Sequence, residues 1–249
     1  MKLINNFKSA NFNKRKDRRI LFIIIHYTAL RNCSEAISYL CNPKNKVSSH
    51  FLISQKGEIF CLVDENKRAW HAGISYWNGY RDINSLSLGI ELDFSINDSN
   101  NKYSKNMINA LINLIKNLKK KYNIKNENIL GHSDIAPYRK IDPGPKFPWH
   151  ILQKNNISLY VVNKNNIQIN SIKKWFLKNK INSNKKISLF IFNYLGYDTS
   201  LAKKRSGQYI KLLKAYKSHF RQLNDSKVLD EDTLNFMITH FLNIVLKKK

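Results

Sequence analysis

The run of residues 20–25, ILFIII, restricts the fold of this 249-residue chain more than any other segment. It is continuously apolar and mostly β-branched, and two arginines precede it. A run of this length and composition is typical of a strand buried on both faces, as in the middle of a parallel or mixed sheet. It is far shorter than the roughly 20 apolar residues of a membrane-spanning helix. The sequence therefore predicts a central strand and no transmembrane segment.

Two histidines follow predicted strands. His26 comes directly after the central strand, and His132 ends the segment ENILGH, which we predict to be a second short strand. In open α/β sheets ligands gather at the carboxyl ends of strands, because the loops converge there. We therefore expect the two imidazoles to lie close together.

The loop after His132 brings a carboxylate to the same place. Asp142 lies only ten residues later, too near for another strand and helix, so the chain is expected to loop back over the strand end. Pro137, Pro143 and Pro145 restrict that loop, and Gly144 permits a tight bend. Two imidazoles and a carboxylate are suitable ligands for a catalytic zinc ion, which takes three protein ligands and leaves a fourth position open.

The remaining patterns predict an α/β fold with a central mixed β-sheet flanked by helices. Residues 49–54 and 58–64 are interpreted as a hairpin with Gly57 at the turn, and residues 86–94 as a strand with one packed face and Glu91 on the polar face. An amphipathic helix follows Ser104, its expected cap, and Ser34 is expected to cap a shorter one.

After residue 150 the sequence loses its prolines, and three helical patterns predict a small all-α three-helix bundle. We divide the chain into a basic N-terminal extension (1–18), a catalytic domain (19–150), a connector (151–184) and the helical region (185–249).

The formal net charge of +26 ordinarily indicates a polyanionic partner. The basic residues are scattered in twos and threes, and no nucleic-acid-binding motif accompanies them, so we predict no nucleic-acid partner. An extended anionic substrate such as the bacterial cell wall remains compatible with this charge. The three cysteines indicate no disulfide framework.

Five motifs resemble a known family when they are taken in order: IIIHYTA, SSHFLI, AWHAG, LGIEL and GHSDIAPYRKIDPGPKFPW. They are similar to the zinc-dependent N-acetylmuramoyl-L-alanine amidases of the AmpD/AmiD type, with most likeness to the AmiD branch. This resemblance implies hydrolysis of the amide between the lactyl group of N-acetylmuramic acid and L-alanine of the stem peptide, in cell-wall turnover or recycling. It also implies one Zn²⁺ per chain, held by His26, His132 and Asp142, with Glu91 as general base and Lys140 as a catalytic cation.

The same resemblance implies further site residues. Tyr27, His50, Trp70 and His71 are expected to line the substrate site, and the C-terminal helices resemble a peptidoglycan-binding-like domain. Arg139 adjoins Lys140, but Lys140 matches the family's catalytic lysine. The expected partners are peptidoglycan or muropeptide fragments, and a monomer is favoured. A binding module that uses the same cleft without hydrolysis is the alternative.

The substrate points to the cell envelope or to secretion. The first nineteen residues nevertheless lack the apolar stretch of a conventional signal peptide, so a cytoplasmic location is the alternative.

Overall fold

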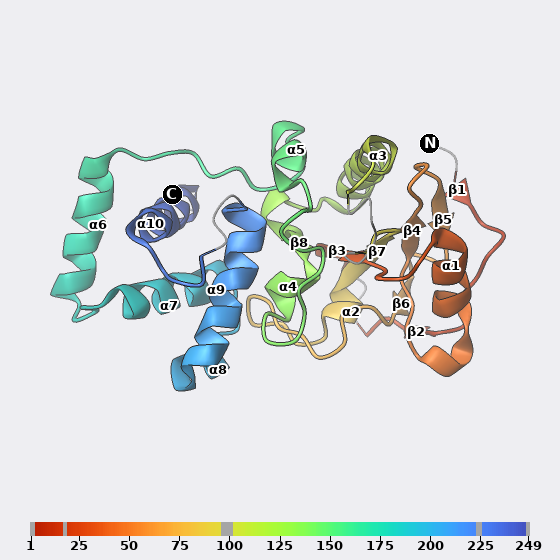
Figure 1. Ribbon diagram of the computed structural model, residues 1–249, viewed down its shortest axis with the longest axis horizontal. Coiled ribbons are helices and arrows are strands. Elements are labelled where there is room, and N and C mark those ends of the chain that lie inside the picture. Colours follow the sequence, from red (N-terminus) through yellow and green to blue (C-terminus); the bar gives the residue numbers. More distant parts are fainter. Residues whose placement is uncertain (1–2, 17–18, 96–101, 223–225, 248–249) are drawn as a thin grey trace.

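The computed structural model describes residues 3–16, 19–95, 102–222 and 226–247, and it joins a half that contains the sheet to a helical half (Figure 1). Within these residues six strands form the main sheet, in the spatial order β1 (Leu3–Ile4), β5 (Ile59–Cys61), β4 (Phe51–Ile53), β7 (Ser87–Leu92), β3 (Phe22–Tyr27) and β8 (Ile129–Gly131). β3 is parallel to β7 and β8, whereas β4 and β5 are antiparallel. The predicted mixed sheet is thus confirmed.

The central strand is β3, as its apolar run predicted. Ile23 and Ile25 pack on one face of the sheet in a core that includes residues of α3 (Lys105–Tyr122). Ile24 packs on the opposite face with residues from the helical half. Because both faces are covered, the run contains no polar position until His26.

β7 differs from its prediction as a strand with one packed face. Five of its six residues are buried, and only Glu91 keeps partial exposure. Gly89 lies beneath the ring of His71, and a Cβ at this position would lie 2.5 Å from His71 Cγ. The apolar and polar sides of this strand therefore alternate as expected, but protein covers both.

Two local predictions are confirmed and one is wrong. β4 and β5 form the expected hairpin, with Gly57 at a φ of 86°. Ser104 caps α3 by accepting a hydrogen bond from the backbone N–H of Met107. The cap of α1 (Cys33–Cys41), however, is Asn32 rather than Ser34, because the Asn32 side chain accepts from Glu35 N.

Short helices complete the half that contains the sheet. They are α2 (Ile83–Leu86), α4 (His132–Ile135), α5 (Trp149–Lys154) and two 3₁₀ turns (Pro43–Asn45 and Asn126–Asn128). The helical half contains α6 (Asn166–Lys178), α7 (Asn184–Leu195), α8 (Ser200–Lys204), α9 (Ser206–Phe220) and α10 (Glu231–Lys247).

The helical half is larger than the predicted three-helix bundle. α7, α9 and α10 correspond to the three expected helices, and α8 is an additional short one. α6 lies inside the segment interpreted as a connector, where its fully buried Phe176 packs with Phe241 of α10. Only Ile169 and Phe176 of this helix are buried, while Ile167, Trp175 and Leu177 are exposed, so its apolar residues do not form one buried stripe that would have indicated a helix.

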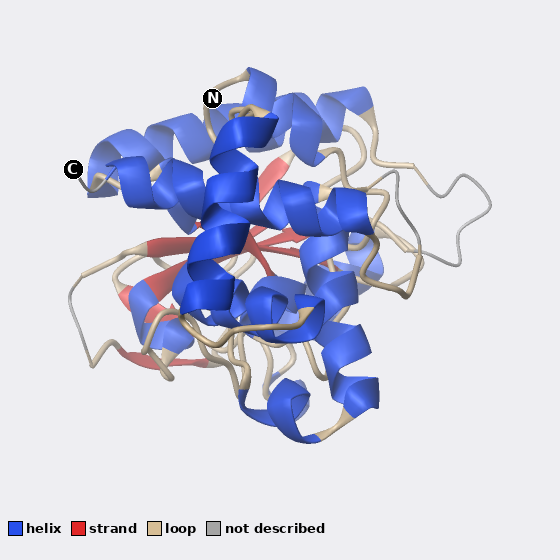
Figure 2. Cartoon of the chain, turned by 90° about the vertical axis from the view of Figure 1, so that its left-hand side faces the viewer, coloured by secondary structure: helices blue, strands red, loops and turns tan. Residues whose placement is uncertain are grey.

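The two halves share one core, so the helical half is not a detached bundle. Leu130 of β8 and Ile191 of α7 belong to the same buried cluster. The rings of Trp77 and Tyr197 lie 4.7 Å apart across the boundary. From the side in Figure 2, the helices stand in front of the strands.

The N-terminal segment is also part of the fold rather than an extension. β1 pairs with β5 at the edge of the sheet, and β2 (Phe12–Lys14) forms a second, two-stranded sheet with β6 (Lys67–Ala69). Arg15 is buried and donates hydrogen bonds to four backbone carbonyls, those of Glu65, Asn84, Ser85 and Ser87.

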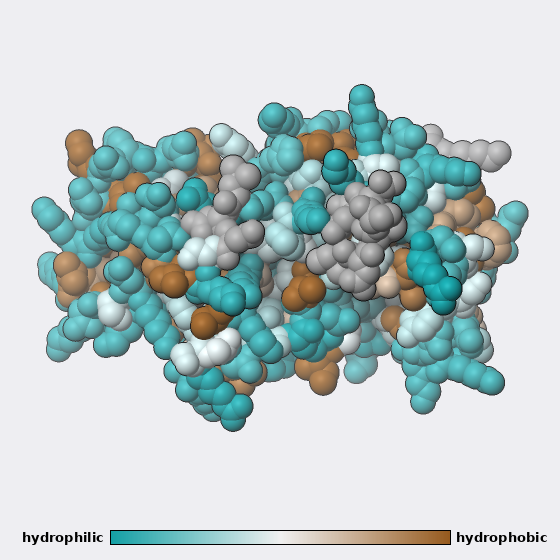
Figure 3. Space-filling view, viewed as in Figure 1, coloured by the Kyte–Doolittle hydropathy of each residue, from teal (hydrophilic) through white to brown (hydrophobic). Residues whose placement is uncertain are grey.

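Hydrophilic side chains cover most of the face seen in Figure 3, and the hydrophobic ones occur in small separate groups. In the part of the chain that the structure describes, no helix has both the length and the apolar character needed to cross a membrane.

Candidate metal centre

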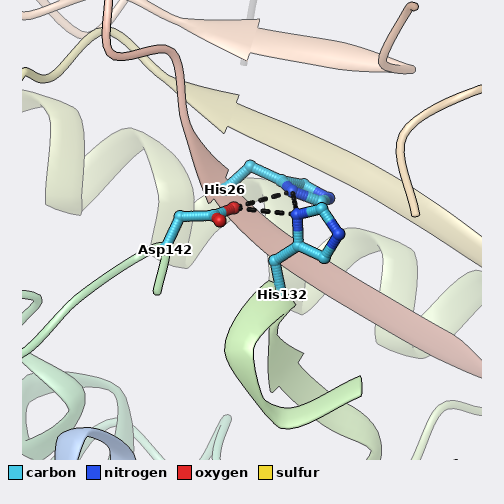
Figure 4. A group of neighbouring side chains, drawn as sticks. All are labelled: His26, His132 and Asp142. Atoms are coloured by element: carbon cyan, nitrogen blue, oxygen red, sulfur yellow. Dashed lines mark hydrogen bonds and ion pairs between the residues drawn. The ribbon is translucent and has the colours of Figure 1, made fainter. Parts of the chain in front are cut away.

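The three predicted ligands meet at one edge of the sheet. His26 lies at the end of β3, His132 opens α4 directly after β8, and Asp142 lies in the following loop (Figure 4). His26 Nδ1 is 3.0 Å from His132 Nδ1 and 3.1 Å from Asp142 Oδ2, and His132 Nδ1 is 3.0 Å from the same oxygen. Three donor atoms from distant parts of the chain therefore form a compact triangle.

Gly131 makes the return of the loop possible. A Cβ at Gly131 would lie 2.6 Å from Cδ of Pro143, so a side chain here would push away the residue next to Asp142. The backbone N–H of Ser133 also donates to the carbonyl of Asp142 at 2.9 Å. The loop is thus held against the start of α4 on the side of the donors.

Burial and neighbouring groups set the ionisation of His26 and Asp142. Burial lowers the pKa of His26 to about 4, with a further contribution from the neighbouring His132, so that this imidazole is neutral near pH 7. Burial alone would favour protonated Asp142, but the two imidazoles hold its pKa well below the usual range. A neutral imidazole and an ionised carboxylate are the forms that bind a metal ion.

A chain of hydrogen bonds fixes which nitrogen of His26 carries the proton and which one presents a lone pair to the centre. Ser87 Oγ donates to the carbonyl of Ile83 at 2.6 Å, so its oxygen accepts from His71 Nε2 at 3.1 Å. His71 Nδ1 then has no proton and accepts from His26 Nε2 at 3.0 Å. The lone pair of His26 is left on Nδ1, which points at the centre.

His132 has the same arrangement with a simpler partner. Its Nε2 lies 3.1 Å from the carbonyl oxygen of Ala72, which can only accept a hydrogen bond. The proton therefore sits on Nε2, and Nδ1 presents its lone pair. Outer hydrogen bonds of this kind fix the tautomer of metal-binding histidines.

The donor set fits a tetrahedral metal ion. With metal–ligand distances of about 2.0–2.1 Å, tetrahedral zinc places neighbouring ligand atoms about 3.3 Å apart. The three separations of 3.0–3.1 Å are close to that value. The two Nδ1 lone pairs and the Asp142 carboxylate face one another with no proton between them. A cation at this position would bind all three atoms. Among the described residues, this is the one group of three such side chains placed to hold a metal ion.

Glu91 lies beside the centre on the neighbouring strand. It is in register with His26, and adjacent residues of parallel strands project to the same face. Its Oε2 is buried without a hydrogen-bond partner among the described residues. Burial raises the pKa of Glu91 to about 8, with a smaller increase from the charge of Asp142.

Lys140 and Arg139 follow different paths from the same loop. Lys140 lies two residues before Asp142 in this loop, and its charge slightly lowers the pKa of both Glu91 and His26. Arg139 instead donates from Nε to the carbonyl of Ile74 at 2.9 Å and from Nη2 to that of Ala72. Arg139 Nη2 also lies 3.4 Å from His132 Nε2, and the choice of Lys140 over Arg139 as the catalytic cation stays a prediction.

Tyr27 and Trp70 remain candidates for the substrate surface. Tyr27 is half-buried at the exit of β3, and the charge of Asp142 contributes to the increase in its pKa, after burial. Trp70 is partly exposed and donates from Nε1 to Asn13 Oδ1 at 2.6 Å.

His50 and His71 are too buried to line a substrate site, and this expectation is corrected. His50 has no exposed surface; its Nδ1 accepts from Gly89 N at 3.0 Å, and Arg15 contacts its Nε2 at 2.9 Å. Burial and the charge of Arg15 lower the pKa of His50 to about 3. His71 contacts His26 instead of solvent. Both histidines therefore lie behind the predicted ligands, on the side away from solvent.

A second buried carboxylate lies on the other side of α4. Asp134 accepts from Tyr197 Oη at 2.6 Å, from His219 Nδ1 at 2.8 Å and from Gly131 N at 2.7 Å. The ring of His219 stacks on Trp149 with a centroid separation of 3.6 Å. Asp134 therefore contacts both the start of α4 and the helical half.

Several of these supporting residues were not identified from the sequence. They are Arg15, Ser87, Tyr197 and His219. Ser87 adjoins the LGIEL motif and could have been suspected from its alternation, because it points to the same side as Gly89 and Glu91. The others had no local signal that linked them to the centre.

Comparison with known proteins agrees with this geometry. Residues 16–145 match the family described as N-acetylmuramoyl-L-alanine amidase. Among characterised relatives, N-acetylmuramoyl-L-alanine amidase AmiD of Escherichia coli is 38% identical over 161 residues, covering 57% of this chain and 55% of the relative. The 1,6-anhydro-N-acetylmuramyl-L-alanine amidase AmpD of Haemophilus influenzae is 34% identical over 160 residues, covering 57% of this chain and 86% of the relative. The chain thus spans about half the length of the Escherichia coli AmiD and AmpD relatives that it matches.

Two solved structures extend the similarity into the helical half. AmiD of E. coli, in complex with anhydro-N-acetylmuramic acid-L-Ala-D-γ-Glu-L-Lys, superimposes with a TM-score of 0.75 at 30% identity, covering 93% of this chain and 91% of that one. AmpDH3 of Pseudomonas aeruginosa, in complex with anhydromuramic pentapeptide, gives the same TM-score and identity, covering 96% of this chain and 95% of that one. From its motifs, its fold and its matched region, this chain belongs to the N-acetylmuramoyl-L-alanine amidase family.

Proposed function

We propose that this protein is a zinc-dependent amidase that hydrolyses the bond between the lactyl group of N-acetylmuramic acid and L-alanine of the stem peptide. The observation that carries this proposal is the triangle of His26 Nδ1, His132 Nδ1 and Asp142 Oδ2 with the buried Glu91 beside it. The relatives solved with anhydromuropeptides support this substrate class.

These three side chains would hold the zinc ion. When bound, zinc supplies a Lewis acid that polarises a carbonyl and increases the acidity of water. The outer hydrogen bonds from His26 to His71 and from His132 to Ala72 keep both Nδ1 lone pairs directed at it.

Glu91 is the proton carrier in this proposal. Its unpartnered Oε2 can accept a proton from the attacking water and deliver it to the nitrogen of the departing L-alanine. A pKa raised toward neutrality suits a group that must both accept and donate a proton.

Lys140 supplies positive charge where the scissile carbonyl develops negative charge. It lies two residues before Asp142, and its ammonium has no hydrogen bond with any described residue. A preorganised donor at an oxyanion is worth roughly 3 to 4 kcal/mol, which corresponds to a rate factor on the order of 100 to 1,000.

The decisive experiment is digestion of anhydromuramyl-L-Ala-D-γ-Glu-L-Lys followed by mass spectrometry. We expect release of the intact tripeptide, loss of that release after chelation, and recovery with added zinc. Glu91→Gln and Lys140→Ala should lower turnover with the metal content unchanged. Cleavage at another bond, or release that survives complete removal of the metal, would reject the proposal; binding without cleavage would favour the recognition module.

A further inference from the structure

A cavity of about 610 Å³ lies between the loop after α4 and helix α9. Its volume falls within the range of about 300 to 1,000 Å³ typical of small-molecule sites. Loop residues from Pro137 to Ile141 form one wall, and α9 residues that include Lys211 and Lys214 form the other. We refer to this cavity as the α9 pocket.

Both walls of the α9 pocket carry positive charge. Arg139 and Lys140 line it from the loop, and Lys211, Lys214 and Lys217 line it from α9. The described residues that line it include no aspartate or glutamate. Like charges that face one another across a cavity repel, so an anion is the occupant that lowers the electrostatic energy most.

Two of these cations are already engaged by the protein. Lys217 is buried, and its Nζ donates to the carbonyls of Ser226 and Val228 and to Asp230 Oδ2 at 2.8–3.1 Å. Arg139 is held by the backbone carbonyls of the 72–74 segment. Asp230 compensates the charge of Lys217, whereas Arg139 contributes charge but few free donors.

The remaining lysines keep donors available. Lys211 is exposed and spends one donor on the carbonyl of Tyr138 at 3.1 Å. Lys214, one helical turn later, makes no hydrogen bond or ion pair with any residue that the structure describes. Spacing of i and i+3 puts both side chains on the same side of α9.

Lys140 connects the α9 pocket to the metal centre. It lines the pocket together with Ser133 and Ile141, which are the chain neighbours of the ligands His132 and Asp142. A ligand whose reacting bond lies at the centre can therefore extend past Lys140 into the pocket.

The rest of the lining favours a peptide over a small inorganic anion. Pro137, Pro145 and Ala215 contribute apolar surface, and Ile141 is 63% exposed at this site. Apolar walls with a few cationic groups match a chain that alternates aliphatic and carboxylate groups.

We propose that the α9 pocket binds the carboxylate-bearing part of the stem peptide, with Lys211 and Lys214 as specificity residues for those carboxylates. This inference rests on the proposed function, because it assumes that the scissile amide lies at the metal centre. A γ-linked D-glutamate keeps its α-carboxylate free, so a stem of the kind bound in the AmiD complex carries the required anions. The helical half then contributes directly to substrate selection.

The test measures the dissociation constant by calorimetry in a Glu91→Gln background, where turnover does not interfere. The ligands are anhydromuramyl-L-Ala-D-γ-Glu-L-Lys and its counterpart with both carboxylates amidated. The double variant Lys211→Gln/Lys214→Gln should weaken binding of the acid form about 3- to 10-fold and leave the amidated form within about 2-fold, as expected for two partly exposed ion pairs. Lys116→Gln, an exposed lysine in the middle of α3, is the matched control and should change neither value.

Equal weakening of both ligands, or equal effects of the double variant and the control, would overturn the inference. Tighter binding of a short single-stranded oligonucleotide through the same two lysines would overturn it as well. Hydrolysis of the amidated muropeptide by the unaltered protein separates the two proposals. Turnover of both forms without a preference for the acid form removes only the pocket. Absent turnover of both forms removes the proposed function and leaves the calorimetric comparison to decide the pocket.

Discussion

Two buried clusters of carboxylate and imidazole lie on opposite sides of the single helical turn α4, and they differ in where the protons are. Around Asp134, a tyrosine hydroxyl, an imidazole and a backbone N–H all donate to the carboxylate. Around Asp142, both imidazoles present Nδ1 lone pairs. The first cluster satisfies its carboxylate internally, and the second requires a cation. Residue types alone do not separate a structural cluster from a metal centre, whereas the outer hydrogen bonds do.

We call the cluster around Asp142 the metal-facing cluster. The largest effect is expected from removing its negative charge. Asp142→Asn replaces an ionised ligand with a neutral amide whose N–H₂ cannot bind a metal ion. Loss of an outer partner typically costs 10- to 100-fold in metal affinity, so loss of a ligand should cost at least roughly 100-fold. Competition with a chromogenic chelator measures this affinity. Retention of affinity within a few-fold of the unaltered protein would show that Asp142 is not a ligand.

We call the cluster around Asp134 the helix-facing cluster. Loss of its carboxylate should lower the stability of the fold. Asp134→Ala leaves three buried donors without an acceptor, and each such donor costs about 1 to 3 kcal/mol, with losses that do not add fully. We expect a decrease of about 3 kcal/mol in the free energy of unfolding, or roughly 6 to 12 °C in Tm for a chain of this size. Thermal denaturation of the metal-free protein measures it.

Tyr197→Phe is the milder companion to that variant. It removes one donor and should cost about 1 kcal/mol. If both variants had the same Tm as the unaltered protein, the cluster would contribute nothing to the stability of the fold.

The chain from His26 through His71 to Ser87 should tune affinity with less effect on folding. His71→Ala frees the tautomer of His26, and we expect a 10- to 100-fold loss of metal affinity. Trp70→Phe, at the adjacent residue, should leave affinity unchanged because Trp70 donates to Asn13 instead. Chelator competition on both variants, with circular dichroism as the folding check, distinguishes them. An equal loss in both would assign the effect to the segment and not to the tautomer.

The smallest effect concerns Glu91 and has a defined dependence on pH. Its pKa is about 8 in the folded protein, against 4.5 as the ordinary value, so the folded state binds the extra proton between these limits. Stability contributed by the protonated acid is therefore lost as pH rises from about 4.5 to 8. Glu91→Gln should stabilise the metal-free protein by on the order of 1 to 2 kcal/mol at pH 8 and by almost nothing at pH 4. A gain in Tm that does not grow with pH would contradict this environment for Glu91.

The sequence predicted the metal-facing cluster because its members are marked locally. His26 and His132 end apolar runs, and the prolines around Asp142 mark a loop that has to return. The sequence did not indicate the cluster around Asp134, because Tyr197 and His219 lie 63 and 85 residues from Asp134 and resemble ordinary core residues of helices. Partners of that kind are fixed by packing between the two halves, which no local pattern encodes.

The same reason explains the errors in the fold. β1 and β2 are only two and three residues long, too short for a periodic pattern, and they depend on partners far along the chain. The apolar residues of α6 are spread around the helix, and Phe176 packs into a core formed largely by other helices. His50 and His71 were assigned to the substrate surface because a histidine in a motif does not reveal how deeply it lies.

The four-residue length of α4 has a mechanical consequence. Such a short element cannot bend to absorb a displacement, and it bears His132 at its first position and Asp134 at its third. We therefore expect a movement of Tyr197 or His219, which hydrogen-bond to Asp134, to shift the His132 imidazole on the other side of α4. Ion loading and docking of the helical half are therefore thermodynamically linked, and each should strengthen the other by an equal free energy. Heating should then melt the two halves in one cooperative transition whose midpoint rises with metal concentration.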